Sequence, residues 1–261
     1  MVRVRVQVTG PADAFTDVAV ASLLLRELPD EWDEVVRVFV PAPTIGFTRR
    51  DLRAPGIAQA VQVAHDHGFT PVVRAPGGRV AAYGPGSVIV DHVTRTRVGF
   101  DTGEPFRRNA RAHLRLLRSL GVDAHIGELE GEYCPGEYSI NVGGRFKVVG
   151  SAQRVTLRAS LFSTVFQVDA SPSLHSVLAG VSAALAYPFA PSTVGGVSDV
   201  LAIDVDEFLD AVVDDYEQRL GLVGHHVPAR IADLLSDLPA RDGDAFDAET
   251  WARARLSSSG P

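Results

Sequence analysis

E-Y-C-P-G-E-Y-S-I-N-V-G-G-R-F-K-V-V-G-S-A-Q-R, residues 132–154, contains the only cysteine of the chain, Cys134, and its only lysine, Lys147. The pattern predicts a loop, a strand over residues 138–142, a Gly143-Gly144 turn and a second strand over residues 147–150. An ammonium, unlike a guanidinium, can lose its proton when desolvated and can point at a single oxyanion. The stretch therefore indicates a site that combines a thiol with an ammonium. The alternative is a chance lysine beside a small buried cysteine.

Composition limits the classes of function. The 261 residues carry a net charge of -7, which argues against a dedicated nucleic-acid binder. The sequence contains no run of 18 apolar residues, so we expect no membrane span. The first ten residues alternate between valine and polar residues, which predicts a strand rather than a signal peptide. A single cysteine suits a reducing cytoplasm, where we expect the protein to be located. The eight histidines show no zinc-ligand spacing, so we expect no metal site.

The order of predicted elements indicates the fold class. Apolar periodicity predicts helices over residues 16–28, 55–68, 106–120, 174–185 and 204–220. Strands are predicted over residues 35–40, 71–74, 87–93 and within 155–168. Helices and strands do not alternate strictly, so we expect an α+β fold in which mixed or antiparallel sheets pack with helices. Residues 1–222 are expected to form the main domain, and residues 223–261 a partly helical extension with a frayed end.

Two segments outside residues 132–154 are candidates for binding. The segment A-P-G-G-R-V-A-A-Y-G-P-G, residues 75–86, follows a predicted strand. Its glycines would let the backbone approach a ligand, although a plain glycine-rich turn is the alternative. The predicted helix 106–120 carries Arg107, Arg111, Arg115 and Arg118 along one face, with Arg108 close by. That face is either simply solvated or a docking surface for an acidic carrier domain.

Three segments together resemble the lipoate-protein ligase A / octanoyltransferase superfamily, which shares its catalytic fold with biotin protein ligases. They are V-R-V-F-V-P-A-P-T-I-G-F-T-R-R-D (residues 36–51), R-A-P-G-G-R-V-A-A-Y-G-P-G (74–86) and G-G-R-F-K-V-V-G-S-A-Q-R (143–154). The third is the most specific, since it is similar to the family's G-R-K-[IV]-x-G-S-A-Q and places the family's essential lysine at Lys147. The likeness covers roughly residues 15–220, which implies that residues 1–222 form a catalytic domain of this fold.

The resemblance implies a set of site residues. Lys147 would contact the acyl carbonyl, and Cys134 would carry the acyl group, as a cysteine in this loop does in the transferase branch. The residues that would bind substrate are Arg74, Gly77, Gly78, Arg79, Tyr83, Gly150, Ser151 and Ala152. Because they sit in segments that surround one ligand in the family, we expect them to face one elongated apolar pocket. The sequence departs from the ligase pattern at Ala75, where a second arginine is usual, and at Tyr83 and Gly84, where ligases carry His and often Asp.

Three functions remain open on the sequence. The first is attachment of an octanoyl or lipoyl group to a lysine of a lipoyl-carrier domain through a Cys134 thioester assisted by Lys147, with no cofactor. The second is an ATP-dependent lipoate ligase that uses ATP and Mg²⁺ and forms lipoyl-AMP. The third is a non-catalytic relative that binds an acyl group or a carrier. The expected partners are lipoyl-domain proteins, either 2-oxoacid dehydrogenase subunits or the glycine cleavage H protein, with an acyl carrier protein as a donor.

Overall fold

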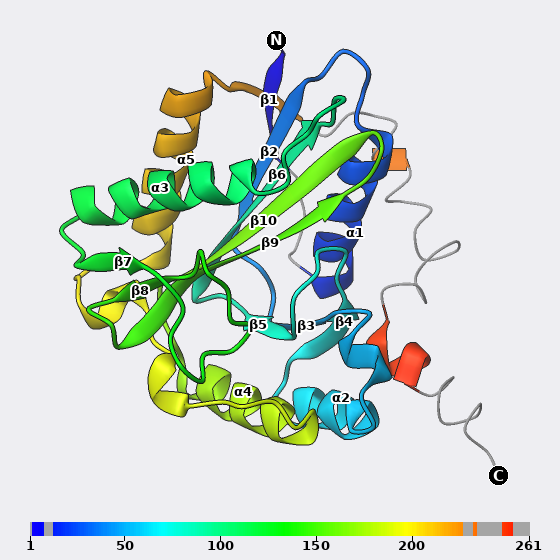
Figure 1. The fold of residues 1–261 in the computed structure, drawn as a ribbon, viewed down its shortest axis with the longest axis vertical. Helices are drawn as coiled ribbons and strands as arrows, with labels where there is room; N and C mark the ends of the chain where they lie inside the picture. The colour runs from blue at the N-terminus through cyan, green and yellow to red at the C-terminus, as the bar shows by residue number, and fades with distance from the viewer. Residues whose placement is uncertain (1, 8–12, 227–231, 234–246, 253–261) are drawn as a thin grey trace.

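The computed structural model describes residues 2–7, 13–226, 232–233 and 247–252 (Figure 1). Its helices are α1 (Ala14–Glu27), α2 (Ile57–Asp66), α3 (Glu104–Ser119), α4 (Pro172–Ala184) and α5 (Val205–Leu220), with 3₁₀ turns η1 (Asp51–Arg53), η2 (Pro191–Thr193) and η3 (Val197–Asp199). Its strands are β1 (Arg3–Gln7), β2 (Glu34–Phe39), β3 (Thr44–Phe47), β4 (Thr70–Val73), β5 (Ala81–Tyr83), β6 (Ser87–Arg95), β7 (Ala124–Ile126), β8 (Ile140–Val142), β9 (Phe146–Val155), β10 (Ala159–Gln167) and β11 (Val223–His226). In the described part of the chain, no helix is long and apolar enough to cross a membrane.

The strands form two mixed sheets. The larger has the order β11-β1-β2-β6-β10-β9-β8-β7, and the smaller has the order β4-β3-β5. In the larger sheet β1 is parallel to β2 and β11, whereas β2, β6, β10, β9, β8 and β7 pair antiparallel in turn. The expected α+β class with mixed sheets is confirmed.

Helices cover both faces of the larger sheet. Neighbouring residues of a strand point to opposite faces, and Val35 and Val36 of β2 belong to different core clusters. Val35 packs with Leu24 of α1, whereas Val36 is in the cluster that holds Leu117 of α3 and Phe208 of α5. Helices α3 and α5 therefore lie on the face opposite α1, as Figure 1 shows.

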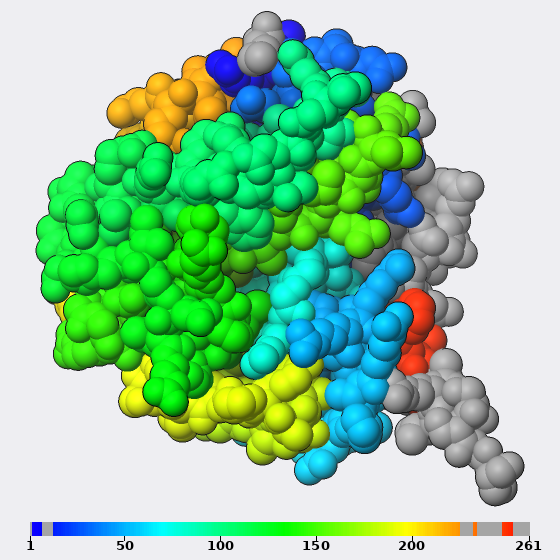
Figure 2. Space-filling view, viewed as in Figure 1, coloured from blue at the N-terminus to red at the C-terminus, as the bar shows by residue number. Residues whose placement is uncertain are grey.

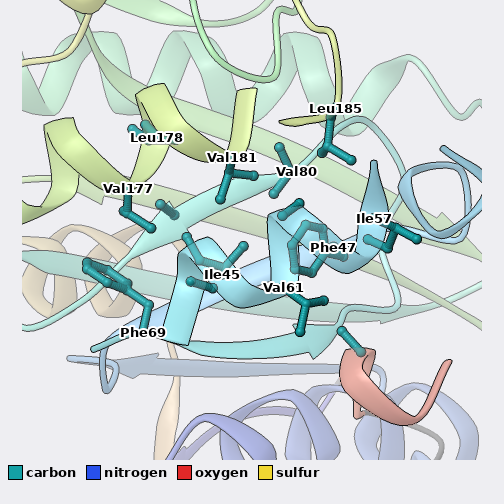
Figure 3. Packing of buried hydrophobic residues seen from close by; sticks show 14 of the residues in the cluster. Ile45, Phe47, Ile57, Val61, Phe69, Val80, Val177, Leu178, Val181 and Leu185 are labelled. Atoms are coloured by element: carbon teal, nitrogen blue, oxygen red, sulfur yellow. The ribbon is translucent and has the colours of Figure 1, made fainter. Parts of the chain in front are cut away.

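The smaller sheet packs against α2 and α4. Its core contains Ile45 and Phe47 of β3 against Val61 of α2 and Val181 of α4 (Figure 3). Buried strands of this kind are expected to be continuous apolar runs, and every residue of β3 is buried. This apolar unit supports the glycine-rich segment 75–86, which begins after β4 and includes β5.

Several boundaries differ from those predicted. The first hairpin strand begins at Ile140, two residues later than predicted, because residues 127–139 form a loop held by its own side chains. The second continues to Val155 rather than ending at Gly150, because β10 pairs with it through that length. Strand β11 continues the larger sheet past residue 222, and Ala248 and Ala252 pack in the core of the smaller sheet. The end predicted to fray, S-S-S-G-P at residues 257–261, lies outside the described residues.

Candidate active site

The loop that carries Cys134 connects β7 to β8 and is organised by the carboxylate of Glu132. This carboxylate accepts hydrogen bonds from the backbone N–H of Leu129 at 3.0 Å and of Gly136 at 3.3 Å, and from the hydroxyl of Ser139 at 2.6 Å. The donors lie on both sides of Cys134 in the chain. The loop is therefore folded around a single buried acceptor, and the thiol is carried at its turn.

The thiol sulfur meets the glycine-rich segment. The backbone N–H of Arg79 points at Cys134 Sγ at 3.4 Å, and Arg74 Nη2 lies 3.7 Å from it. Gly78 has φ of 99°, and a Cβ built there would lie 2.9 Å from the sulfur. Only glycine satisfies both the left-handed backbone and this close approach. Residues that are more than fifty positions apart in the sequence thus form one sulfur site.

Arg74 is the cation that contacts the sulfur. Its Nη2 also donates to the carbonyl of Arg79 at 2.8 Å, whereas its Nε has no hydrogen-bond partner. Across the described residues, no carboxylate lies within ion-pairing distance of this half-buried guanidinium. A cation at this distance can stabilise negative charge that develops beside the sulfur during a reaction, so the charge of Arg74 suits a reactive cysteine. The sequence placed that role on Lys147.

Lys147 is instead engaged with the loop. Its side chain is 2% exposed, and Nζ donates to Glu132 Oε1 at 3.0 Å and to the carbonyls of Tyr133 and Cys134 at 3.1 and 2.8 Å. Nζ also lies 5.0 Å from the centre of the Tyr133 ring, a cation–π geometry. A Cβ at Gly150 would lie 3.0 Å from Lys147 Cε, so the glycine of the family-like G-S-A-Q segment leaves room for the lysine stem.

Two small cavities replace the single elongated pocket that we expected. Each has a volume of about 40 Å³, and Arg74 lines both, so its side chain lies at the boundary between them. The first is lined by Cys134 and Lys147 among others, and the second by Tyr83 and Asp91. Of the predicted substrate-binding residues, the first cavity also brings together Arg74, Gly150, Ser151 and Ala152.

Three predicted residues lie outside both linings. Gly78 and Arg79 contact the sulfur from the side, as described above. Gly77 is exposed, and a Cβ built on it would have no neighbour within 4 Å. Glu132 was not predicted as a site residue, because it is one of 32 acidic residues and only its place two positions before Cys134 distinguishes it from the others.

A second group of buried charges borders the other cavity. Arg37 of β2 pairs with Asp17 of α1 and lies 3.9 Å from Asp91 of β6, which accepts a hydrogen bond of 2.8 Å from Ser163. Burial raises the pKa of Asp91 to about 6, against the opposing effect of Arg37. Burial also raises the pKa of Asp17, with Arg37 again acting in the opposite direction. The sequence does not reveal this group, because its members come from distant segments.

The basic face of α3 begins beside the thiol loop. Phe106 stacks on Tyr138 of that loop with ring centres 5.8 Å apart. Arg107 and Arg108 pair with Asp101 and Glu104, whereas no ion pair is found for Arg111 and Arg115 within the described part of the chain. This face has an open hollow of about 290 Å³, which is lined by Arg107, Arg108, Arg111, Arg115 and Glu104. Figure 2 shows α3 and the green segment that follows it on the same face as residues of the glycine-rich segment.

The described residues contain no group of three or more His, Cys, Asp or Glu side chains that could hold a metal ion.

Comparisons with known proteins identify the family. The model of the lipoyl protein ligase A/B catalytic domain matches residues 13–217. The octanoyl-[GcvH]:protein N-octanoyltransferase of Exiguobacterium sibiricum is 31% identical over 123 residues, which cover 46% of this chain and 43% of that enzyme. The enzyme of the same name from Oceanobacillus iheyensis is 23% identical over 89% of this chain and 83% of its own length. A lipoate-protein ligase A bound with ATP has the same fold, with a TM-score of 0.79 and 18% identity over 97% of this chain and 99% of its own. The chain belongs to the lipoyl protein ligase A/B catalytic-domain family.

Proposed function

We propose that this protein transfers an octanoyl or lipoyl group to a lysine of a lipoyl-carrier domain through a thioester on Cys134. The observation that carries the proposal is the sulfur site, in which Cys134 Sγ faces both the Arg79 N–H and the Arg74 guanidinium. The relatives named as octanoyl-[GcvH]:protein N-octanoyltransferases support the same class of reaction. A further relative, from Listeria monocytogenes, is named as a lipoyl-[GcvH]:protein N-lipoyltransferase, and its name supports transfer of a lipoyl group as the alternative.

The transfer takes place in two acyl exchanges. The Cys134 sulfur gives up its proton and attacks the carbonyl carbon of the acylated donor, so that a carbon–sulfur bond forms. The bond from that carbon to the donor nitrogen or sulfur breaks, and the donor leaves with the proton that the thiol gave up. The lysine amine of the acceptor then attacks the thioester, the carbon–sulfur bond breaks, and the amine proton returns to the thiol. Each exchange passes the acyl group from one carrier to the next without oxidation or reduction. Neither exchange therefore needs ATP, another nucleotide or Mg²⁺.

Arg74 stabilises negative charge during these exchanges. It lies 3.7 Å from the sulfur, and in the described part of the chain it has no carboxylate partner to neutralise it. During attack its charge favours the oxyanion that forms next to the sulfur. Removing one oxyanion donor from an enzyme typically costs about 2.7–4 kcal/mol of transition-state stabilisation. Arg74 is therefore as important to this proposal as the thiol.

The proposed partners are acylated and unacylated carrier domains. The names of the relatives point to the H protein of glycine cleavage as the donor, and an octanoylated acyl carrier protein is the other donor to test. The face of α3 that bears Arg111 and Arg115 would suit a carrier with an acidic surface, since opposite charge steers association. Its start at Phe106, which stacks on Tyr138, connects that face with the thiol loop.

Intact-mass measurement tests the proposal directly. The wild-type protein is mixed with octanoylated H protein or octanoyl-acyl carrier protein, and an increase by one octanoyl group that hydroxylamine removes is expected on Cys134. Cys134→Ser should fold with a similar melting temperature and lose more than about a hundredfold in transfer, since a hydroxyl needs a stronger base than a thiol does.

The parallel reaction contains lipoate or octanoate together with ATP and Mg²⁺, and no carrier-bound donor. Lipoyl- or octanoyl-dependent release of pyrophosphate, together with full activity of Cys134→Ser, would overturn the proposal in favour of an adenylate-forming ligase. Failure of the wild-type protein to take up an acyl group from either donor would also overturn it.

A further inference from the structure

A group of arginines lies beside the glycine-rich segment, where the η1 turn follows β3. Arg49, Arg50 and Arg53 are exposed there, and Arg79 of the glycine-rich segment is half-buried. Within the described residues no carboxylate pairs with any of these four, which we refer to as the η1 patch. By contrast, other exposed arginines do have carboxylate partners, namely Arg97, Arg107, Arg108 and Arg158.

The one acidic residue of this stretch points into the protein. Asp51 is the only acidic residue between Thr44 and His65, and it is 0% exposed. Its carboxylate accepts hydrogen bonds from the backbone N–H of Thr48 and from the hydroxyl of Tyr187, both at 2.7 Å. These bonds keep the carboxylate inside the turn, so the surface of the η1 patch presents cations alone.

Arg79 connects the patch to the sulfur site. The centre of its guanidinium lies 4.9 Å from the centre of the Tyr187 ring, a cation–π geometry, while its backbone N–H points at Cys134 Sγ at 3.4 Å. Arg50 is also close to Tyr187, because Arg50 and Arg79 both oppose the rise of the Tyr187 pKa to about 12 that burial and Asp51 cause. The patch and the sulfur therefore lie on two sides of one residue.

The chain between the patch and the thiol is bare backbone. Gly77 and Gly78 are exposed, and a Cβ built on Gly77 would have no neighbour within 4 Å. A Cβ on Gly78 would lie 2.9 Å from Cys134 Sγ, so this glycine borders the sulfur directly. An acyl-bearing arm that crosses the segment here passes over glycine backbone rather than over side chains.

We propose that the η1 patch docks the acidic surface of the carrier domain that exchanges acyl groups with Cys134. The inference rests on the proposed thioester. Because both exchanges use the same sulfur in turn, the same patch serves the donor and the acceptor carrier. The whole chain carries a net charge of -7, so an acidic carrier is repelled overall and needs a surface of cations alone to bind in one orientation.

The arginine face of α3 is the other basic surface near the thiol loop, and it lies farther from the sulfur. At 1.5 Å per residue, Arg111 and Arg115 are about 8 and 14 Å along the helix from Phe106, the residue that stacks on the loop. Arg79, in contrast, contacts the sulfur itself. We therefore expect the η1 patch to contribute more to carrier binding than the α3 face does.

The variant Arg50→Glu/Arg53→Glu tests the docking surface. Residues three apart in a 3₁₀ turn lie on the same side, so the variant reverses two neighbouring exposed charges. The measurement is the rate of acyl loading from an octanoylated H protein of net negative charge, at low and high salt (about 0.05 and 0.5 M). We expect kcat/KM to fall about twentyfold at low salt and less than about threefold at high salt, with kcat little changed, since such charges act mainly on association.

A small uncharged donor separates docking from chemistry. The octanoyl thioester of N-acetylcysteamine passes its acyl group to the Cys134 sulfur and leaves as the free thiol, without a carrier domain. It should load Arg50→Glu/Arg53→Glu as fast as wild type. Arg111→Glu/Arg115→Glu makes the same change of charge on α3 and should lose less than the η1 variant in loading from the H protein. Arg158→Glu, at the turn between β9 and β10, should leave both reactions unchanged.

Three results would overturn the proposal. One is loading of Arg50→Glu/Arg53→Glu from the H protein at the wild-type rate in low salt. Another is an equal loss with the small thioester, because the substitutions would then have damaged the thiol site. The third is a larger loss in Arg111→Glu/Arg115→Glu, which would place the carrier on α3. If wild type takes up no acyl group from any donor, the proposed function fails, and the affinity of the unacylated H protein for wild type and for the η1 variant still decides the docking surface. Equal affinities would then count against the η1 patch, and a weaker affinity of the variant would support it.

Discussion

Two clusters of buried charge lie on either side of Arg74, and they differ in their balance. The Glu132–Lys147 cluster holds one anion and one cation, whereas the Asp17–Arg37–Asp91 cluster holds two carboxylates for one guanidinium. The second cluster responds by favouring protonation, as the pKa of about 6 at Asp91 shows. Burial is the main cause of the raised pKa of Asp91, and the single guanidinium of Arg37 opposes it only in part.

The clusters also differ in what they hold. The hydrogen bonds of the balanced pair end on the thiol loop. Those of the carboxylate-rich cluster join the strands to α1, since Arg37 donates to the Asp17 backbone carbonyl at 3.1 Å and Ser163 of β10 donates to Asp91. Ser163 also lines the cavity beside Cys134. The balanced pair therefore supports the sulfur directly, and the other cluster supports the sheet beneath it.

Removing one partner of the balanced pair should have the largest effect on stability. Lys147→Ala leaves the Glu132 carboxylate buried without a cation, a change that typically costs about 3–5 kcal/mol in the free energy of unfolding. Leu129, Gly136 and Ser139 still donate to the carboxylate, but these neutral donors do not replace the positive charge of Lys147. Urea denaturation at pH 7 measures the loss.

The matched comparison is Glu132→Gln/Lys147→Met, which removes both charges. It should be more stable than Lys147→Ala, because no uncompensated charge remains. Equal losses in the two variants would show that the pair is not coupled, and the contrast between the clusters would then have no energetic basis.

The sequence predicted the parts of the site that lie within continuous segments. Cys134 and Lys147 stand out as the only residues of their kinds, and the periodicity of residues 106–120 and 204–220 corresponds to α3 and α5. The family-like G-S-A-Q segment predicts a substrate-binding role for Gly150, which lines the cavity beside Cys134 and leaves room for the lysine stem. Unusual composition and regular spacing were sufficient in these places, because the information is local.

Partners that come together only through the sheet could not be predicted. Arg37, Asp91 and Ser163 meet because β2, β6 and β10 are neighbours in that order, and their positions in the chain give no sign of it. Lys147 was assigned to the sulfur because opposite charges attract, but a buried glutamate with three donors of its own holds the ammonium instead. The choice between two acceptors for one cation depends on distances that a sequence does not contain.

Removing the cation of the carboxylate-rich cluster should have an intermediate effect that depends on pH. Arg37 lowers the pKa of both Asp17 and Asp91, so in Arg37→Ala both carboxyls should bind protons up to a higher pH than in wild type. The folded variant then binds more protons than folded wild type between about pH 6 and pH 8, and its stability falls relative to wild type as the pH rises. We expect a loss of about 1 kcal/mol at pH 5 and about 3 kcal/mol at pH 8. A loss in Arg37→Ala that stays constant from pH 5 to pH 8 would show that the carboxyls of this cluster do not respond to pH.

The smallest expected effect, and the most specific, is that of Asp91→Asn. The pKa of Asp91 is about 6 in the folded protein against 3.8 for an ordinary aspartate, so between these values the folded state holds a proton that the unfolded state has released. Asp91 therefore makes wild type less stable as the pH rises from 4 to 6, by about 2 kcal/mol over that range. The replacing asparagine cannot ionise and can still accept the Ser163 hydrogen bond, so the stability of the variant minus that of wild type should rise with pH by the same amount. Taking this difference removes the opposite contribution of buried His113, whose pKa is lowered by burial to about 3 and which stabilises the fold as the pH rises.

Asp101→Asn is the control. Hydrogen bonding from the Gly103 N–H lowers the pKa of exposed Asp101 from its ordinary 3.8, so the difference of this variant from wild type should stay nearly flat from pH 4 to pH 6. A difference curve for Asp91→Asn that stays flat from pH 4 to pH 6 would mean that Arg37 neutralises both carboxylates and that the two clusters behave alike.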